Sequence, residues 1–168
     1  MTPRHPLPFL WLLTDSRTDG TLDQAIGRLP RGSAIVFRHY HLPPAERLHR
    51  LQQVRTLARA GGHRVIWAGS AREAARLGLA GSYGADGTLA TAHSLREIGR
   101  ANRRKAAAIL LSPVFPTRSH PGGKVLGPLR FRLLAARARV PVIALGGMTR
   151  RTARRLGWPR WAAIDGLA

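Results

Sequence analysis

The chain contains no cysteine, only eight acidic residues and only two lysines, Lys105 and Lys124. Without cysteine, disulfides, thiolate metal sites and cysteine nucleophiles are excluded. Long hydrophobic runs are also lacking: the N-terminal run Leu7–Leu13 is short, interrupted by proline and followed by Asp15. It is too short for a signal peptide or a membrane span. We therefore expect a buried first strand here, and a cytoplasmic protein with no membrane partner.

Basic residues, almost all of them arginine, dominate the charge. There are 28 basic residues, giving a formal net charge of +20. Such a charge attracts anions in general and makes nucleic acid a candidate partner. The arginines are scattered over the outer faces of expected helices, however, as in Arg100–Lys105 and Arg150–Arg155. This distribution favours phosphorylated small molecules over nucleic acid.

Short apolar runs alternate with longer stretches of helical spacing, which predicts a parallel α/β sheet. The expected strands are Phe9–Thr14, Ser33–Phe37, Arg64–Trp67, Leu79–Tyr83, Thr88–Ala92, Ala107–Leu111, Pro141–Leu145 and Ala162–Ile164. Several are apolar at nearly every position, as in strands covered on both faces of a barrel or a doubly wound sheet. Between Tyr83 and Thr88 there is no room for a crossover helix. The length of 168 residues, with no visible linker, predicts one domain over residues 1–168.

Glycines follow the last two expected strands. Gly146 and Gly147 come directly after the seventh, and Thr149 then opens a helix. Glycine lets the backbone approach an anion, and a helix start offers N–H groups. Gly166 follows the eighth strand, and the loops after strands seven and eight often bind phosphate in barrels. The alternative is two ordinary tight turns. If phosphate binds, we expect Gly147→Asp to abolish binding and leave the fold intact.

Other candidate residues lie at expected strand ends. The long loop Ser112–Gly127 carries hydroxyls and cations that suit an anion, or it is a solvated loop stiffened by proline. His93 ends a strand and is a proton donor, an anion ligand or a structural residue. Arg38 ends the second strand and is suited to bidentate phosphate binding. His39 and His41 follow, but no acidic residue near them in the sequence indicates a metal site.

These motifs together resemble the thiamine phosphate synthase and thiazole tautomerase family. Leu111–His120 (LSPVFPTRSH) is similar to the family's signature loop, and Pro141–Thr149 (PVIALGGMT) to its phosphate-binding strand and glycine pair. Thr91–Ser94 with Glu97, and Leu12–Asp15, resemble two further family segments. The resemblance implies a trimmed (β/α)8 TIM barrel with shortened helices and no full C-terminal helix. It also implies magnesium-dependent joining of an aminopyrimidine diphosphate to a thiazole phosphate, with release of pyrophosphate.

The resemblance assigns roles residue by residue. It implies catalytic roles for Arg38, His93 and His120. It implies substrate or phosphate binding by Thr91, Thr117, Ser119, Gly146, Gly147 and Gly166. The chain departs from the family where magnesium would bind: Ala68-Gly69 replaces the asparagine–aspartate after the third strand. The family's second magnesium aspartate lies after the fourth strand, where the chain is shortened and Asp86 is the one nearby candidate. Magnesium is thus expected as a cofactor only by resemblance, and its ligands are unknown.

Three functional hypotheses follow. The first is a thiamine phosphate synthase-like transferase acting on phosphorylated pyrimidine and thiazole molecules. The second is a non-catalytic or regulatory barrel that binds a phosphorylated ligand. The third is an isomerase similar to the thiazole tautomerases, although Pro113 stands where that subfamily has its catalytic histidine. A homo-oligomer is compatible with each of them.

Overall fold

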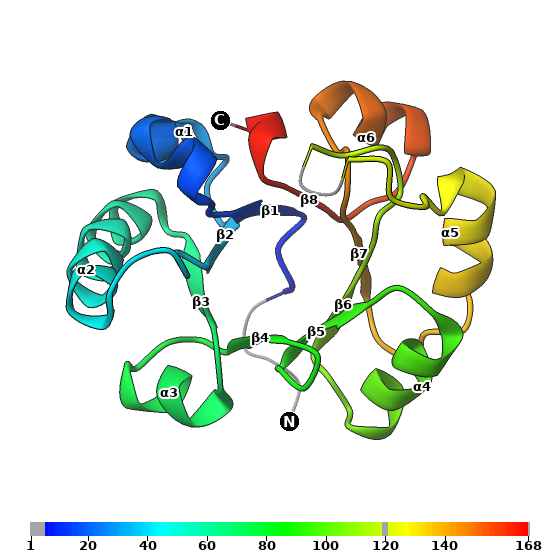
Figure 1. Ribbon diagram of the computed structural model, residues 1–168, viewed down its shortest axis with the longest axis horizontal. Coiled ribbons are helices and arrows are strands. Elements are labelled where there is room, and N and C mark those ends of the chain that lie inside the picture. The colour runs from blue at the N-terminus through cyan, green and yellow to red at the C-terminus, as the bar shows by residue number, and fades with distance from the viewer. Residues whose placement is uncertain (1–5, 119–120, 168) are drawn as a thin grey trace.

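The computed structural model describes residues 6–118 and 121–167, which form a closed barrel of eight parallel strands (Figure 1). The strands follow one another around the barrel in chain order, and β8 pairs with β1. They are β1 (Leu10–Leu13), β2 (Ala34–Phe37), β3 (Arg64–Ala68), β4 (Ser82–Gly84), β5 (Leu89–Ala92), β6 (Ala108–Leu111), β7 (Val142–Ala144) and β8 (Trp161–Ala163). The expected (β/α)8 barrel is therefore confirmed.

Short helices surround the barrel. They are α1 (Leu22–Arg28), α2 (Pro44–Gly61), α3 (Ala71–Arg76), α4 (Leu95–Arg103), α5 (Gly127–Ala135) and α6 (Arg150–Leu156), with 3₁₀ turns η1 (Ser16–Thr21) and η2 (Asp165–Leu167). Several begin at side-chain caps that the sequence predicts, such as Ser70, Ser94 and Thr149. In the described ranges, no helix combines the length and apolar character needed to cross a bilayer.

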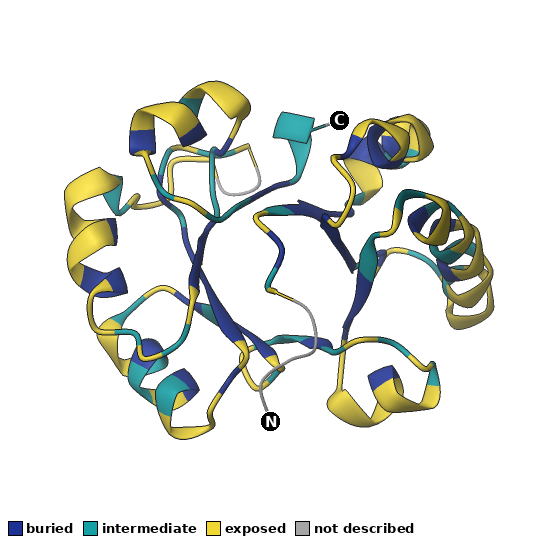
Figure 2. Cartoon of the chain, turned by 180° about the vertical axis from the view of Figure 1, so that it is seen from behind, coloured by how far each residue is buried: buried dark blue, intermediate teal, exposed yellow. Residues whose placement is uncertain are grey.

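The strands bury side chains on both faces, as their apolar sequences predict. Because successive side chains point to opposite faces, Trp11 and Leu13 fill the barrel interior while Leu12 packs outward. The interior set also includes Val36, Leu110 and other residues, and two outer clusters lie between strands and helices. Figure 2 shows the buried strands inside a ring of helices whose outer faces are exposed. This rigid frame carries the loops at the carboxyl ends of the strands.

No helix lies between β4 and β5, in agreement with the sequence prediction. Two side chains close this short link instead. The Thr88 hydroxyl donates to the Ser82 carbonyl at 3.0 Å and accepts from the Ser82 N–H at 2.9 Å, and the Thr88 N–H donates to the Ser82 hydroxyl at 3.2 Å. Gly87 packs so closely that a Cβ there would lie 2.6 Å from the Ser82 carbonyl oxygen. These contacts keep the eight-strand ring closed without the crossover helix that parallel strands usually need.

Candidate functional site

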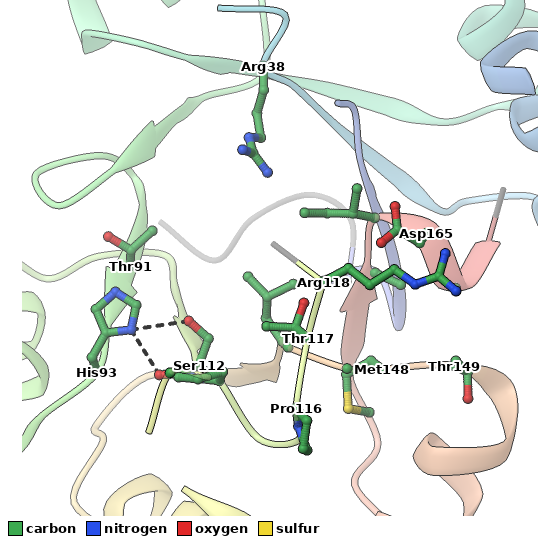
Figure 3. Close-up of a pocket in the computed structure, with 18 of the residues that line it drawn as sticks. Arg38, Thr91, His93, Ser112, Pro116, Thr117, Arg118, Met148, Thr149 and Asp165 are labelled. Atoms are coloured by element: carbon green, nitrogen blue, oxygen red, sulfur yellow. Dashed lines mark hydrogen bonds between the residues drawn. The ribbon is translucent and has the colours of Figure 1, made fainter. Parts of the chain in front are cut away.

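A cavity of about 1000 Å³ opens at the carboxyl ends of the strands (Figure 3). In TIM barrels this end is where active sites are built. The cavity brings together nearly all site residues predicted from the sequence. Its lining includes Arg38, Thr91, His93, Thr117, Gly146, Gly147 and Gly166. Ser119 and His120 lie outside the described residues, so their predicted roles remain predictions.

The loop after β6 is tied to its own base and to the loop after β7. Leu126 and Gly127 donate their N–H groups to the carbonyls of Pro113 and Val114, at 2.9 and 3.0 Å. Val114 in turn donates to Leu145 at 2.9 Å. Thr117 and its neighbours therefore project over the cavity from a loop with a closed base.

The glycine pair after β7 adopts positive φ angles, +96° at Gly146 and +61° at Gly147. A Cβ at Gly147 would lie 2.4 Å from the Pro116 carbonyl oxygen, and one at Gly146 would lie 2.6 Å from the Cα of Pro113. The glycines are thus required for close packing of two loops. The expectation that Gly147→Asp leaves the fold intact is wrong, because any side chain there meets backbone atoms.

The same pair also presents backbone donors. Among the described residues, none accepts a hydrogen bond from the N–H groups of Gly147 or Met148, which both line the cavity. Thr149 behaves differently: it forms a capping box in which its hydroxyl accepts from Thr152 N–H and its own N–H donates to the Thr152 hydroxyl. The donors available to an anion therefore lie in the loop after β7, ahead of the helix start that the sequence suggested.

The loop after β8 packs directly against this donor loop. A Cβ at Gly166 would lie 2.1 Å from the Met148 carbonyl oxygen, so only glycine fits there. Asp165 lines the cavity and pairs with Arg17, whose Nη1 is 3.6 Å from its Oδ2. The loops after β7 and β8 thus form one wall, in the place where barrels commonly hold phosphate.

His93 is held at the end of β5 by two contacts. Its Nδ1 lies 2.9 Å from the Ser112 carbonyl oxygen and 3.3 Å from the Ser112 hydroxyl. Since a carbonyl only accepts, Nδ1 carries the proton and Nε2 holds a lone pair. Glu97 also holds this segment, because its carboxylate accepts a hydrogen bond from the backbone N–H of His93 at 2.7 Å. The arrangement suits His93 to accept a proton, or to donate one once it is protonated.

Cations outnumber carboxylates around the cavity. Arg38, Arg118 and Lys124 line it, and Asp165 is the one carboxylate among the described lining residues. Behind Arg38 lies Asp15, with its Oδ2 3.5 Å from Arg38 Nη2 and its Oδ1 2.8 Å from Arg17 Nε. Partial burial raises the pKa of Asp15, but hydrogen bonds from Arg17 and the nearby Arg38 outweigh it and hold that pKa below its usual value. The cavity therefore has an excess of positive charge, which favours the binding of an anion.

The magnesium site implied by the resemblance does not fit this donor set. Magnesium is held through carboxylates. Ala68-Gly69 supplies none after β3, and Asp86 lies outside the cavity lining, paired with Arg100 at 2.6 Å and Arg104 at 3.7 Å. Asp165 is already paired with Arg17. We derive no chemical step through a metal in this cavity.

Sequence reasoning missed two residues that line the cavity and one contact outside it. Tyr83 lines the cavity from β4, and burial raises the pKa of its hydroxyl. Tyr40 also lines it, with the Arg47 guanidinium 5.2 Å from its ring centroid. The interpretation that no acidic residue lies near His39 and His41 is wrong, because η1 brings Asp19 to 2.9 Å from His39 Nε2. Such contacts between loops of different strands leave no signal in local sequence.

Comparison with known proteins leads to one family. Residues 89–164 match the family described as thiamine monophosphate synthase. A protein of Aquifex aeolicus (strain VF5) named "Putative thiamine-phosphate synthase 2" is 39% identical over 59 residues. That match covers 35% of this chain and 32% of the relative, so the chain matches about a third of that relative's length.

The solved structures extend the similarity of fold to most of the chain. A thiamine phosphate pyrophosphorylase from Pyrococcus furiosus superimposes with a TM-score of 0.73 over 93% of this chain and 85% of that chain. Its sequence identity is 19%, so the likeness concerns the barrel itself. The match to the family model spans β5 to β8 and includes the loops after β6 and β7, which line the cavity.

Proposed function

We propose that this chain is a thiamine monophosphate synthase-like protein and that its cavity binds a phosphorylated heterocycle of thiamine biosynthesis, a thiazole phosphate; the matches of residues 89–164 to that family and of 59 residues to its relative support the proposal. One observation carries the proposal: the unpartnered N–H groups of Gly147 and Met148, in the described part of the chain, share a cavity wall with Arg118 and Lys124. Backbone donors combined with cations are the arrangement that binds phosphate.

The remaining lining suits the heterocyclic part of such a ligand. Pro113, Leu145, Ala163 and Ile164 add apolar groups to the cavity lining. An aromatic ring in this space loses contact with water while its phosphate stays on the polar wall. His93, which lines the cavity after β5, would serve such a ligand as a proton acceptor through Nε2, because Nδ1 is bonded to Ser112.

A second candidate function is the joining reaction itself, and the position of Arg38 favours it. Its side chain points into the cavity from the wall opposite Met148 and Thr149 (Figure 3). A volume of about 1000 Å³ accommodates two small molecules, one with its phosphate at Gly147 and one with its diphosphate at Arg38. In that reaction the thiazole nitrogen forms a bond to the pyrimidine methylene carbon, and the carbon–oxygen bond breaks with its electrons leaving on pyrophosphate. Arg38 would stabilise that leaving charge.

Two measurements test these proposals in order. Calorimetric titration with the thiazole phosphate should give saturable binding that Lys124→Ala weakens and Arg96→Ala, an exposed arginine on α4, does not. Incubation with both substrates, with and without magnesium, then tests for thiamine phosphate. Binding without product supports a binding barrel and rejects the joining reaction. Absence of binding rejects the thiazole phosphate as ligand.

A further inference from the structure

Three potential metal ligands meet on the far side of β2 from the cavity. Asp19 belongs to η1, and His39 and His41 to the loop after β2. Their ligand atoms all lie within 4.8 Å of one another, and none of the three residues lines the cavity. The cluster joins two loops that are separate in sequence. Neither thiazole phosphate binding nor the joining reaction, as proposed for the cavity, involves it.

Residues other than Asp19 and His41 also fix the orientation of the His39 ring. It is 1% exposed and adopts an unusual positive φ of 36°. Its ring stacks on Phe37, with centroids 4.6 Å apart and planes 5° from parallel. Its Nδ1 lies 2.8 Å from the Thr14 hydroxyl, and its Nε2 lies 2.9 Å from Asp19 Oδ1. A buried imidazole whose second nitrogen is hydrogen-bonded is the usual form of a histidine ligand in metal sites.

Thr14 can select the tautomer that a metal requires. Its hydroxyl oxygen already accepts the Arg38 N–H at 2.9 Å, and a hydroxyl oxygen has two lone pairs. Without a metal, His39 Nε2–H donates to the Asp19 carboxylate, which only accepts. When a metal ion displaces that proton, Nδ1–H can donate to the second lone pair of Thr14, and Nε2 then presents its own lone pair toward the ion between Asp19 and His41. The ring of His41 lies close by, with its centroid 5.2 Å from that of His39. Two imidazoles and one carboxylate then face one point.

We propose that Asp19, His39 and His41 form a binding site for a divalent transition-metal ion of the Zn²⁺ or Ni²⁺ class. Two imidazole nitrogens with one carboxylate oxygen are a donor set for these ions, whereas magnesium prefers oxygen alone. His41 is exposed, so the site is open to solvent on one side. Three protein ligands leave further coordination positions for water or a small molecule.

Arg50 competes with a metal ion for the carboxylate of Asp19. Its Nε and Nη2 both lie 2.9 Å from Asp19 Oδ1, and its Nη2 also lies 2.9 Å from Asp23 Oδ1. Asp23 can therefore keep the guanidinium when a metal takes Asp19. The pair of carboxylates balances the charge of Arg50 and leaves one negative charge for the ion. We consequently expect an affinity below that of a closed structural zinc site.

The test uses untagged full-length protein and the metal alone. Titration with Zn²⁺ or Ni²⁺, followed by calorimetry, should show one saturable site per chain. His41→Ala should weaken it at least about tenfold, since it removes a ligand. His49→Ala, an exposed histidine on α2, is the matched control and should leave the affinity unchanged. His41 is exposed, so thermal unfolding of His41→Ala without metal should match that of the parent protein.

Each outcome decides the proposal. A single site that is lost in His41→Ala and kept in His49→Ala supports it. A Co²⁺ absorption spectrum that differs from that of the parent protein in His41→Ala but not in His49→Ala also supports it. Absence of saturable binding overturns it. Equal weakening in both variants also overturns it, because that result indicates scattered surface histidines. The site does not depend on the cavity ligand, so failure here leaves the proposed function untouched.

Discussion

The backbone N–H of Phe115 donates a 3.0 Å hydrogen bond to the carbonyl oxygen of Gly146. This bond joins the loop after β6 to the loop after β7, the two segments by which the sequence most closely resembles the thiamine phosphate synthase family. Each loop shapes the other, because the glycines accept the close approach of Pro113 and Pro116. The loops after β6 and β7, which carry Arg118, Lys124 and the Gly147 and Met148 N–H groups, thus depend on each other, and changes in either are expected to affect both folding and binding.

Gly147→Ala is expected to destabilise the fold by at least about 1–3 kcal/mol, because alanine is strained at this positive φ and its Cβ meets the Pro116 carbonyl. Gly27→Ala is the matched control. Gly27 lies in α1 with no atom within 4 Å of an added Cβ, so alanine there should be neutral or stabilising by up to about 1 kcal/mol. Denaturant unfolding of both variants measures the difference. Equal stabilities would contradict the packing argument.

Asp15→Asn is expected to tighten the binding of inorganic phosphate about two- to fivefold. Asp15 competes for Arg38 at 3.5 Å, and two unit charges at such a distance interact by about 1 kcal/mol in water. Asparagine keeps an oxygen that can accept the Arg17 N–H at the start of η1. Asp86→Asn, an equal change of charge on the outside of the barrel, should have little effect. Calorimetry at low salt is the measurement, and weaker binding by Asp15→Asn would refute the idea.

Anion binding in the cavity is expected to be independent of magnesium. Arginine and lysine side chains and backbone N–H groups provide the positive potential there, and the described lining has one carboxylate, already paired with Arg17. The affinity for inorganic phosphate, which unlike pyrophosphate binds magnesium only weakly in solution, should therefore agree within about twofold with magnesium and with a chelator, allowing for screening by the added ions. Binding that requires magnesium would show that carboxylates converge in a way this geometry does not provide.

Glu97→Gln is expected to lower the unfolding temperature at pH 7 by up to about 2 °C, a small effect because solvent screens the group. Partial burial raises the pKa of Glu97, but hydrogen bonds from the His93 N–H and from Ser94 outweigh it and lower that pKa. A carboxyl whose folded pKa is lowered contributes stability above its unfolded pKa of about 4.3, and loses it as the pH falls through the folded pKa.

The difference between parent and Glu97→Gln should therefore close as the pH falls from about 4.5 toward 3. Glu46→Gln is the control, since Glu46 is exposed in the first turn of α2 and accepts no hydrogen bond in the described part of the chain. A difference that stays constant with pH would mean that the substitution acts through shape and not through charge.

Most strands were predictable because their apolar runs are buried whichever loops connect them. The exception is β4, which was predicted at Leu79–Tyr83 and lies at Ser82–Gly84. The absence of a helix between β4 and β5 was predictable, because the sequence leaves too few residues for one between Tyr83 and Thr88. Contacts between loops were not, since the approach of Asp19 to His39 depends on how η1 folds over β2. Asp86 shows the same limit: its place after β4 suggested the cavity, but Arg100 holds it outside. Residues at strand ends are found from sequence, whereas their partners are found only from the fold.

The link between β4 and β5 also has a consequence for how the barrel moves. Tyr83 points into the cavity, so the outward positions of β4 are Ser82 and Gly84, which offer almost no apolar surface for a helix to cover. Local opening there exposes little hydrophobic surface, so its free-energy cost is lower than at β6, whose residues are buried throughout. Amide hydrogen exchange should therefore begin at β4, and the cavity should open transiently on the side of Tyr83.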